Sequence, residues 1–324
     1  AQQPGGGLAE APPPGRGRVA LAALSGMVAV LCRQNNVIWV LFALGTAMLR
    51  FLLQTKEFQD SLPMPLSLTL VLRFIVIMAK KWKQLLAQFW PLLLPIMGFV
   101  VFIFWNDGSV VLGDRAHHAA VFHPAQLGPA AALAAALRGP WDRRDCPLHP
   151  DRLREMKVRY LSSTGQKGTA LLAFGIAVFL CYNYTLDHPF LLADNRHYTF
   201  YLWRRVLGRW PGAAGQALRG ALGAPYLAAA AFVLLQLGKT RPSLWVLIYC
   251  VAVSLVLVPA QLLEPRYFTL PVFIATLNSP QLSPRSLVLG VLASALVDAG
   301  AAHVFLRRPF PAGPGEPAEQ RFLW

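Results

Sequence analysis

Eight apolar runs, separated by polar and basic segments, recur along the chain. A helix needs about 20 apolar residues to cross the hydrocarbon core of a bilayer, and each run reaches or approaches that length. Two are weak, because the first is short and the fourth contains Pro124 and Pro129. The pattern predicts an all-α, polytopic membrane protein with about eight transmembrane helices. The runs cover residues 19–32, 36–53, 88–105, 119–137, 169–186, 220–237, 243–262 and 286–306.

A ninth candidate, residues 66–79, is better explained as a helix lying at the membrane surface. It is short, carries Arg73 at its centre and runs into the cluster KKWK at residues 80–83. An arginine at the bilayer centre costs about 2.5–3.5 kcal/mol on insertion scales. An interfacial helix avoids this cost, because its basic side chains reach the headgroup region.

Basic residues test this arrangement, because cytoplasmic loops carry an excess of Lys and Arg. With eight spans, 21 Lys and Arg fall on the side of the two termini and 9 on the other. Making 66–79 a span changes the distribution to 17 against 12 and leaves Arg73 in the membrane. The count favours eight spans with both termini in the cytosol.

Composition agrees with a membrane protein and argues against a nucleic-acid partner. Of 324 residues, 55% are hydrophobic and 14% charged, and the mean hydropathy is +0.45. The net charge of +15 comes from Lys and Arg spread between apolar runs, not gathered on a soluble face. From the Gly- and Pro-rich ends we expect a disordered lead at 1–18, one membrane domain at 19–308 and a cytosolic tail at 309–324.

Four polar clusters fall on the non-cytosolic face in the eight-span arrangement. They are Arg33–Asn36 (RQNN), Gly113–His118 (GDRAHH), Asp187–Tyr201 and Glu264–Tyr267 (EPRY). In the nine-span arrangement RQNN moves to the opposite face. A single binding site needs its polar groups on one side, so we expect these clusters to form one site.

The segment Asp187–Tyr201, DHPFLLADNRHYTFY, is the richest of the four in chemistry. Pro189 suits the first turn of a helix. If 189–203 is helical, one face carries an acid, a base and two aromatic rings, which suits a sugar-phosphate. Trp203 is a further ring that could stack on a sugar. A solvated basic loop is the alternative. The residues of that face are Asp194, His197, Tyr198 and Tyr201.

GDRAHH and EPRY offer groups for an anion, although each has a plain structural explanation. Arg115 can grip a phosphate with its planar fork, and His118 can donate a hydrogen bond. An ion pair within the loop would explain Arg115 equally well. Glu264 and Arg266 are near neighbours of opposite charge, a kind of pair that is usually structural, and the amides of RQNN can simply join two helices.

Several kinds of site are poorly supported. The sequence has no DxD metal-nucleotide motif, Walker A loop, GxSxG or HExxH motif. The cysteines Cys32, Cys146, Cys181 and Cys250 are scattered, which suggests neither a zinc site nor a disulfide framework. We therefore expect no metal.

Five segments, in this order, closely resemble the dolichyl-phosphate-glucose-dependent alpha-1,2-glucosyltransferases of the endoplasmic reticulum. LLADNRHYTFYLWRRV is the most specific of them, and the resemblance extends from about residue 20 to the C-terminus. The segments are Arg33–Val40, Gly113–Ala119, Leu191–Val206, Leu262–Pro271 and Gln320–Trp324.

The resemblance implies the multi-spanning, GT-C-like fold of lipid-phosphosugar glycosyltransferases, in the endoplasmic reticulum membrane with the polar motifs facing the lumen. It implies transfer of the last glucose, in alpha-1,2 linkage, to the lipid-linked oligosaccharide used for protein N-glycosylation. The expected partners are dolichyl phosphate glucose, that oligosaccharide and membrane lipid. No cofactor is expected.

Substrate binding is expected at eleven residues, of which three arginines are candidates to neutralise the leaving phosphate. Family members carry an Asp-Glu pair in a first lumenal loop that has no counterpart upstream of residue 19. We therefore expect the general base there, outside a chain that looks like the C-terminal two-thirds of the enzyme. Ala119 replaces an acidic residue of the family pattern and is given no role. The eleven residues are Arg115, His118, His188, Asp194, Asn195, Arg196, His197, Tyr198, Glu264, Arg266 and Tyr267.

A non-enzymatic membrane protein is the alternative. A transporter should carry ionisable residues near the middle of its spans, whereas here Asp298 is the main example. A regulator of an ion channel places no demand on the loop chemistry, so the sequence alone leaves it open.

Overall fold

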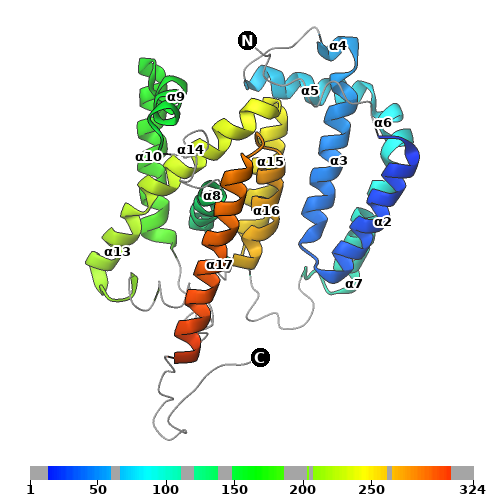
Figure 1. The fold of residues 1–324 in the computed structure, drawn as a ribbon. Coiled ribbons are helices and arrows are strands. Elements are labelled where there is room, and N and C mark those ends of the chain that lie inside the picture. Colours follow the sequence, from blue (N-terminus) through cyan, green and yellow to red (C-terminus); the bar gives the residue numbers. More distant parts are fainter. Residues whose placement is uncertain are drawn as a thin grey trace, which may run out of the picture. The chain divides into compact units, whose positions relative to one another are not determined.

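A computed structural model describes most of the chain as a set of helices (Figure 1). Every regular element within the described part is helical, as the apolar pattern predicts. The described residues are 14–59, 66–110, 120–137, 148–185, 203, 207–260 and 265–307.

Five helical segments are long and apolar enough to cross a membrane, and two shorter apolar helices, Ser243–Leu257 and Tyr267–Leu277, accompany them. The chain is therefore an all-α, polytopic membrane protein. The five segments are Asn36–Leu53, Trp82–Trp105, Thr164–Tyr184, Gly212–Thr240 and Pro284–His303.

The structure corrects two details of the predicted spans. Residues 119–137 were expected to form a span, but their described part contains only the ten-residue α-helix Leu127–Ala136, which follows the short 3-10 helix Pro124–Gln126. Ten residues rise about 15 Å, half of what a span requires. Residues 265–277, which the eight-span arrangement leaves in a loop, form a helix that starts at Pro265 and contains Pro271.

The contacts divide the chain into two units. Unit 1 comprises Ala1–Ala119 and Gln236–Val256, and unit 2 comprises Ala120–Leu235 and Leu257–Trp324. In unit 1, α2 packs on α3 and α7, while α4, α5 and α6 gather around one end of α3. The helices of unit 1 are α2 (Arg16–Cys32), α3 (Asn36–Leu53), α4 (Lys56–Gln59), α5 (Leu68–Lys80), α6 (Trp82–Phe89), η1 (Trp90–Leu92), α7 (Leu93–Trp105) and α15 (Ser243–Leu257).

Helix α5 agrees with the interfacial helix expected at 66–79. Figure 1 shows it running across the end of α3 instead of alongside it. The side chain of Ser67 accepts a hydrogen bond from the amide of Leu70 and so caps the helix start. Arg73 reaches away from the helix to donate to the carbonyl of Glu57 at 3.2 Å, and the Glu57 carboxylate pairs with Lys81 at 3.1 Å. These bonds hold the basic residues in a polar setting.

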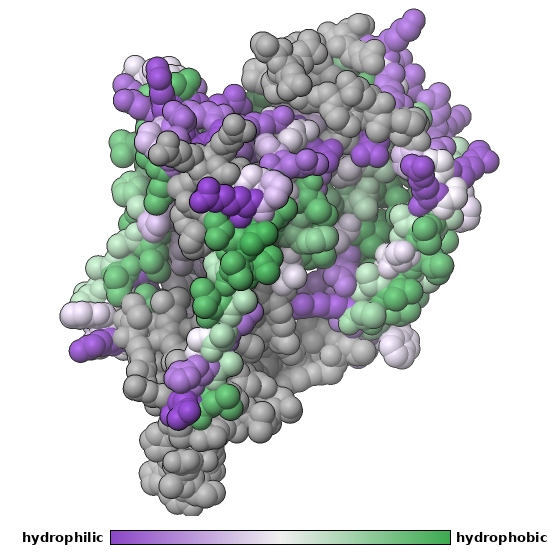
Figure 2. Space-filling model, in the orientation of Figure 1, coloured by the Kyte–Doolittle hydropathy of each residue, from purple (hydrophilic) through white to green (hydrophobic). Residues whose placement is uncertain are grey.

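In unit 2, α10 is the central helix and packs against α9, α13 and η2, while α8 packs against α16. In Figure 2, hydrophilic residues gather over α9, and hydrophobic residues continue below them along α10. Helix α14 begins in unit 2 and ends in unit 1. The helices are η2 (Pro124–Gln126), α8 (Leu127–Ala136), α9 (Pro150–Leu161), α10 (Thr164–Tyr184), α13 (Gly212–Ala221), α14 (Gly223–Thr240), α16 (Pro265–Leu277) and α17 (Pro284–Arg307).

Two features fix the position of α10. A capping box starts the helix: Ser163 accepts from the amide of Gln166, and the Gln166 side chain accepts in return from the amide of Ser163. At the first residue of α14, a Cβ on Gly223 would lie 2.7 Å from the backbone nitrogen of Val178 in α10. Glycine at 223 therefore lets the two backbones touch.

Candidate functional site

Most of the predicted site residues lie outside the described part of the chain. Arg266 is in the first turn of α16, and the structure describes only its backbone. Tyr267 is described and half-buried. The role of each residue remains a prediction. The structure shows instead how the described segments on either side of the motifs contact one another. Outside the described residues are Arg115, His118, His188, Asp194, Asn195, Arg196, His197, Tyr198 and Glu264.

The segment that follows GDRAHH is bound to the segment that precedes EPRY. The amide of Val121 donates to the carbonyl of Pro259 at 3.1 Å, and the amide of His123 donates to Val258 at 2.9 Å. The Gln126 side chain donates to the carbonyl of Ala260. These bonds tie together two parts of unit 2 that are far apart in sequence.

A buried polar pair strengthens this connection. His123 and Gln126 have exposed fractions of 1% and 0%. The Gln126 amide nitrogen lies 3.1 Å from Nδ1 of His123. Because both side chains are used inside the protein, His123 acts here as a structural histidine. This role could not be predicted from the sequence, because His123 follows two other histidines in an apolar run.

The two ends of the segment 186–202 are also held together. At its start, the ring of Tyr184 meets the edge of Phe122, with ring centroids 5.1 Å apart. Arg219 of α13 donates to the carbonyl of Thr185 at 3.4 Å. The same guanidinium lies over the ring of Trp203, 5.3 Å from its centroid. Arg219 thus bridges the residues on either side of the segment with the richest chemistry.

Trp203 was expected to stack on a sugar, and this expectation is wrong for the described structure. Only 2% of the side chain is exposed, because it forms a core with Leu207 on which Leu218, Leu222 and Tyr267 pack. A buried ring has no face for a ligand. It instead joins the end of the 186–202 segment to Tyr267, the last residue of EPRY.

The flanks of three motifs therefore meet within unit 2. The segment after GDRAHH is bonded to the segment before EPRY, and both ends of 186–202 are connected to them through Phe122 and Tyr267. The motifs are visible in the sequence, but the role of Arg219, which joins the two flanks of 186–202, is not. A single arginine on a Gly- and Ala-rich helix gives no signal until the fold places it beside Trp203.

RQNN lies in unit 1, where it forms the turn between α2 and α3. The amide of Arg33 donates to the carbonyl of Ala29 at 3.0 Å and closes α2. The side chain of Asn36 donates to the same carbonyl at 2.8 Å. These bonds support the simple interpretation in which the amides of this cluster join two helices.

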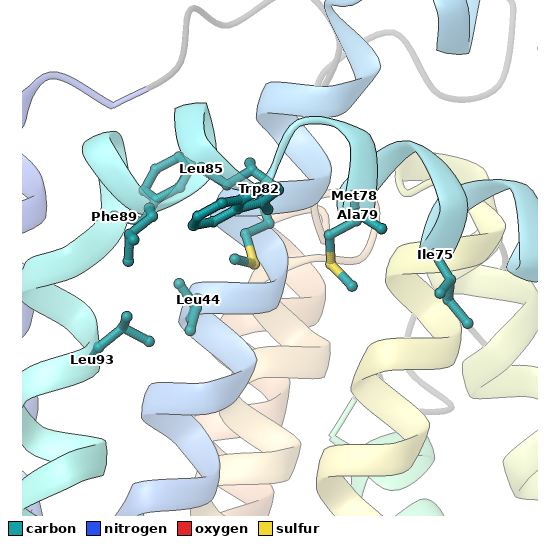
Figure 3. A pocket seen from close by; sticks show the side chains of 10 residues that line it. Leu44, Ile75, Met78, Ala79, Trp82, Leu85, Phe89 and Leu93 are labelled. Carbon is teal, nitrogen blue, oxygen red and sulfur yellow. The ribbon is translucent and has the colours of Figure 1, made fainter.

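A cavity in unit 1 has a different character. Its volume is about 360 Å³, and apolar and aromatic side chains of α3, α5, α6 and α7 line it. In Figure 3, Leu44, Met78 and Trp82 surround the same space. Such a cavity suits a hydrocarbon chain and offers a sugar no set of hydrogen-bond partners. Within the described residues no three His, Cys, Asp or Glu side chains gather as metal ligands.

Comparisons with known proteins place this sequence in a family. A human protein named Dol-P-Glc:Glc(2)Man(9)GlcNAc(2)-PP-Dol alpha-1,2-glucosyltransferase is 31% identical over 319 residues, which cover 94% of this chain and 63% of that protein. The rat protein of the same name is 32% identical over 318 residues, with the same coverage. The Arabidopsis thaliana protein of that name is 28% identical over 356 residues, which cover 95% of this chain and 68% of its own.

The chain spans less than two thirds of the length of the human and rat relatives. No solved structure matches it. The sequence pattern of one family covers residues 15–277, including the segments that flank the candidate site and the helices that hold them. The chain belongs to the DIE2/ALG10 family.

Proposed function

We propose that this chain serves the transfer of glucose from dolichyl phosphate glucose to Glc(2)Man(9)GlcNAc(2)-PP-Dol, forming an alpha-1,2 linkage. We also propose that it works in the endoplasmic reticulum membrane, with the polar motifs of unit 2 facing the lumen. Each relative named above carries the name of such an enzyme, which speaks for a glycosyltransferase and against a transporter or channel regulator.

One structural observation carries the proposal: the flanks of three motifs meet within unit 2. Chain connectivity limits how far the predicted residues can lie from this meeting point. Consecutive residues span at most about 3.6 Å each, so Tyr198 lies within roughly 18 Å of Trp203 and Glu264 within roughly 11 Å of Tyr267. Motifs far apart in sequence can therefore reach one small region.

The proposed reaction is a single displacement at the anomeric carbon of glucose. A general base takes the proton of the acceptor hydroxyl, whose oxygen forms the new bond to that carbon. The bond between the carbon and the phosphate oxygen breaks, and dolichyl phosphate leaves with the electron pair. Negative charge develops on the leaving phosphate, so a nearby cation lowers the barrier.

Three arginines suit this role by residue type. They are Arg115, Arg196 and Arg266, whose planar forks match a phosphate. Arg266 also lies in the first turn of α16, where the backbone amides of a helix start favour an anion. His118, His188 and His197 can donate hydrogen bonds to the leaving group. Asp194 and Asn195 can hold sugar hydroxyls.

The test uses microsomes from cells that lack the terminal glucosyltransferase and express this chain. Two quantities are measured: conversion of the Glc(2) oligosaccharide to the Glc(3) form, and labelling of the chain by a photoreactive analogue of dolichyl phosphate glucose. Arg196→Ala and His197→Ala are expected to reduce both, the arginine change by about 100-fold or more in transfer. Arg209→Ala, an exposed arginine near the same segment, is the matched control.

The two readouts separate binding from catalysis. Labelling without transfer would support donor binding and remove the claim that this chain completes the reaction alone. If the chain neither transfers glucose nor takes up the label, the proposal is wrong. If Arg196→Ala behaves like Arg209→Ala in both assays, the assignment of the site is wrong.

A further inference from the structure

Unit 1 contains two arginines whose buried nitrogens have no partner. Arg50 is in the last turn of α3, and Arg241 lies just before the start of α15. The Nε atom of each is buried without a hydrogen-bond partner, and so is Oγ1 of Thr46, one turn before Arg50. Donors that stay unpaired inside a protein are costly, so this arrangement calls for an acceptor.

The guanidinium group of Arg241 lies on an aromatic cluster that joins α15 to α3. Arg241 lies over the ring of Trp245, 5.6 Å from its centroid, and only 2% of that tryptophan is exposed. Phe42 of α3 packs edge to face with the same tryptophan, with ring centroids 5.4 Å apart. Thr46 and Arg50 are four residues apart and share one face of α3.

A negatively charged acceptor is the one that these two cations favour. Burial lowers the pKa of the Arg241 guanidinium, and the positive charge of Arg50 lowers it further. Two like charges close together in a partly buried position repel each other, and an anion between them removes this repulsion. Among the described residues neither arginine forms an ion pair, and the carboxylate of Glu57, seven residues after Arg50 in the chain, pairs with Lys81.

The position of the pair indicates where such an anion comes from. Arg50 lies near the end of the span Asn36–Leu53, and the span Gly212–Thr240 ends one residue before Arg241. Ends of apolar spans lie at the depth of the lipid headgroups. Helix α15 begins at Ser243, so the amides of its first turn are close to Arg241 in the chain and also favour an anion.

We propose that Arg50, Arg241 and Thr46 bind the phosphate of an anionic phospholipid. The arginines supply charge-assisted hydrogen bonds from two helices, and the threonine hydroxyl supplies a third donor. This site is independent of the proposed glucose transfer. An occupied site joins the end of α3 to the start of α15.

The binding test uses the purified chain in mixed micelles of phosphatidylcholine and phosphatidylserine at a ratio of about four to one. Native mass spectrometry measures how much phosphatidylserine the chain retains. Arg50→Gln and Arg241→Gln are each expected to reduce retention about tenfold, because each removes charge-assisted bonds to the phosphate. Lys80→Gln is the control, since Lys80 is an exposed cation of the same unit. Thr46→Val, which removes one hydroxyl, provides a milder variant should an arginine change prevent folding.

Thermal unfolding separates this role from a purely structural one. In phosphatidylcholine alone, Arg241→Gln is expected to match or exceed the melting temperature of the unaltered chain, because a like-charge contact is removed. Phosphatidylserine should raise the melting temperature of the unaltered chain and leave that of Arg241→Gln unchanged. Equal retention by all variants would overturn the proposal. An equal stabilisation by inorganic phosphate, or selective retention of dolichyl phosphate, would overturn the assignment to a phospholipid.

Discussion

Two arginines, one in each unit, lie against buried tryptophans and yet serve different ends. Arg219 is 5.3 Å from the ring centroid of Trp203, and Arg241 is 5.6 Å from that of Trp245. Both tryptophans are 2% exposed. Arg219 also donates to the carbonyl of Thr185, whereas Arg241 is close enough to Arg50 to feel its charge.

The role of each arginine–tryptophan pair depends on the further group that lies near the guanidinium. A carbonyl beside the guanidinium makes the pair in unit 2 a clamp that joins the two ends of the segment 186–202. A second cation beside the guanidinium makes the pair in unit 1 an incomplete site that an anion would finish. The same two residue types thus support a structural role in one place and a binding role in the other.

The largest effect should come from removing either tryptophan. Trp203→Ala and Trp245→Ala are each expected to lower the free energy of unfolding by about 3–5 kcal/mol, because each leaves a large cavity in a packed core. Only Trp203→Ala should also abolish labelling by the donor analogue, since only this ring anchors the segment with the predicted motif. Denaturant unfolding and the labelling assay measure the two effects.

The exposed residue Trp210 provides the control for both tryptophans. With 55% of its side chain exposed, Trp210→Ala should change the free energy of unfolding by about 0.5 kcal/mol or less. If Trp245→Ala removed donor labelling as fully as Trp203→Ala, the division of roles between the two pairs would be wrong.

A smaller effect is expected where α14 touches α10, because this contact holds α10 and its end at Thr185. Gly223→Ala should destabilise the protein by about 1–3 kcal/mol, since the new methyl group would press on the backbone of Val178. Gly175→Ala is the matched control, because a Cβ there meets nothing within 4 Å. Alanine is also the better helix former, so this control should be neutral or slightly stabilising. Thermal unfolding of both variants decides the matter, and equal destabilisation would contradict the close contact.

The sequence predicted those elements whose signal is local. The span at 36–53 is found with the predicted bounds, because a continuous apolar run ends at polar residues on both sides. A helix is also found where an interfacial one was predicted, at Leu68–Lys80, and its placement at the membrane surface, a prediction that rests on the cost of burying Arg73 in a bilayer, stays a prediction. Both predictions rest on the cost of placing a side chain in lipid, which does not depend on the rest of the fold.

The failures concern residues whose role depends on distant partners. The Ala-rich run at 119–137 resembles a span, but Pro124 and the buried polar pair of His123 and Gln126 interrupt it. Helix α16 was not predicted because its sequence contains Pro265 and Pro271. Proline is nevertheless favoured in the first turn of a helix, where Pro265 lies. Trp203 could not be recognised as a core residue, because Leu218, Leu222 and Tyr267 come from other parts of the sequence. The motifs themselves were visible as residue types, while their mutual placement depends on these distant contacts.

The most direct test of the comparison is a matched substitution in the two pairs. Arg219→Gln should lower the free energy of unfolding by about 0.5–1.5 kcal/mol, because it removes the bond to Thr185 and the contact with the Trp203 ring. Arg241→Gln, measured in neutral lipid, should have no effect or the opposite sign, because the loss of its own ring contact is offset by relief of the charge of Arg50. The two variants therefore differ in the sign of one measured quantity, although both remove a guanidinium from a buried indole. If both variants changed the free energy of unfolding in the same direction in phosphatidylcholine, the comparison would be wrong. Both arginines would then act through their tryptophans alone, whatever group lies near the guanidinium.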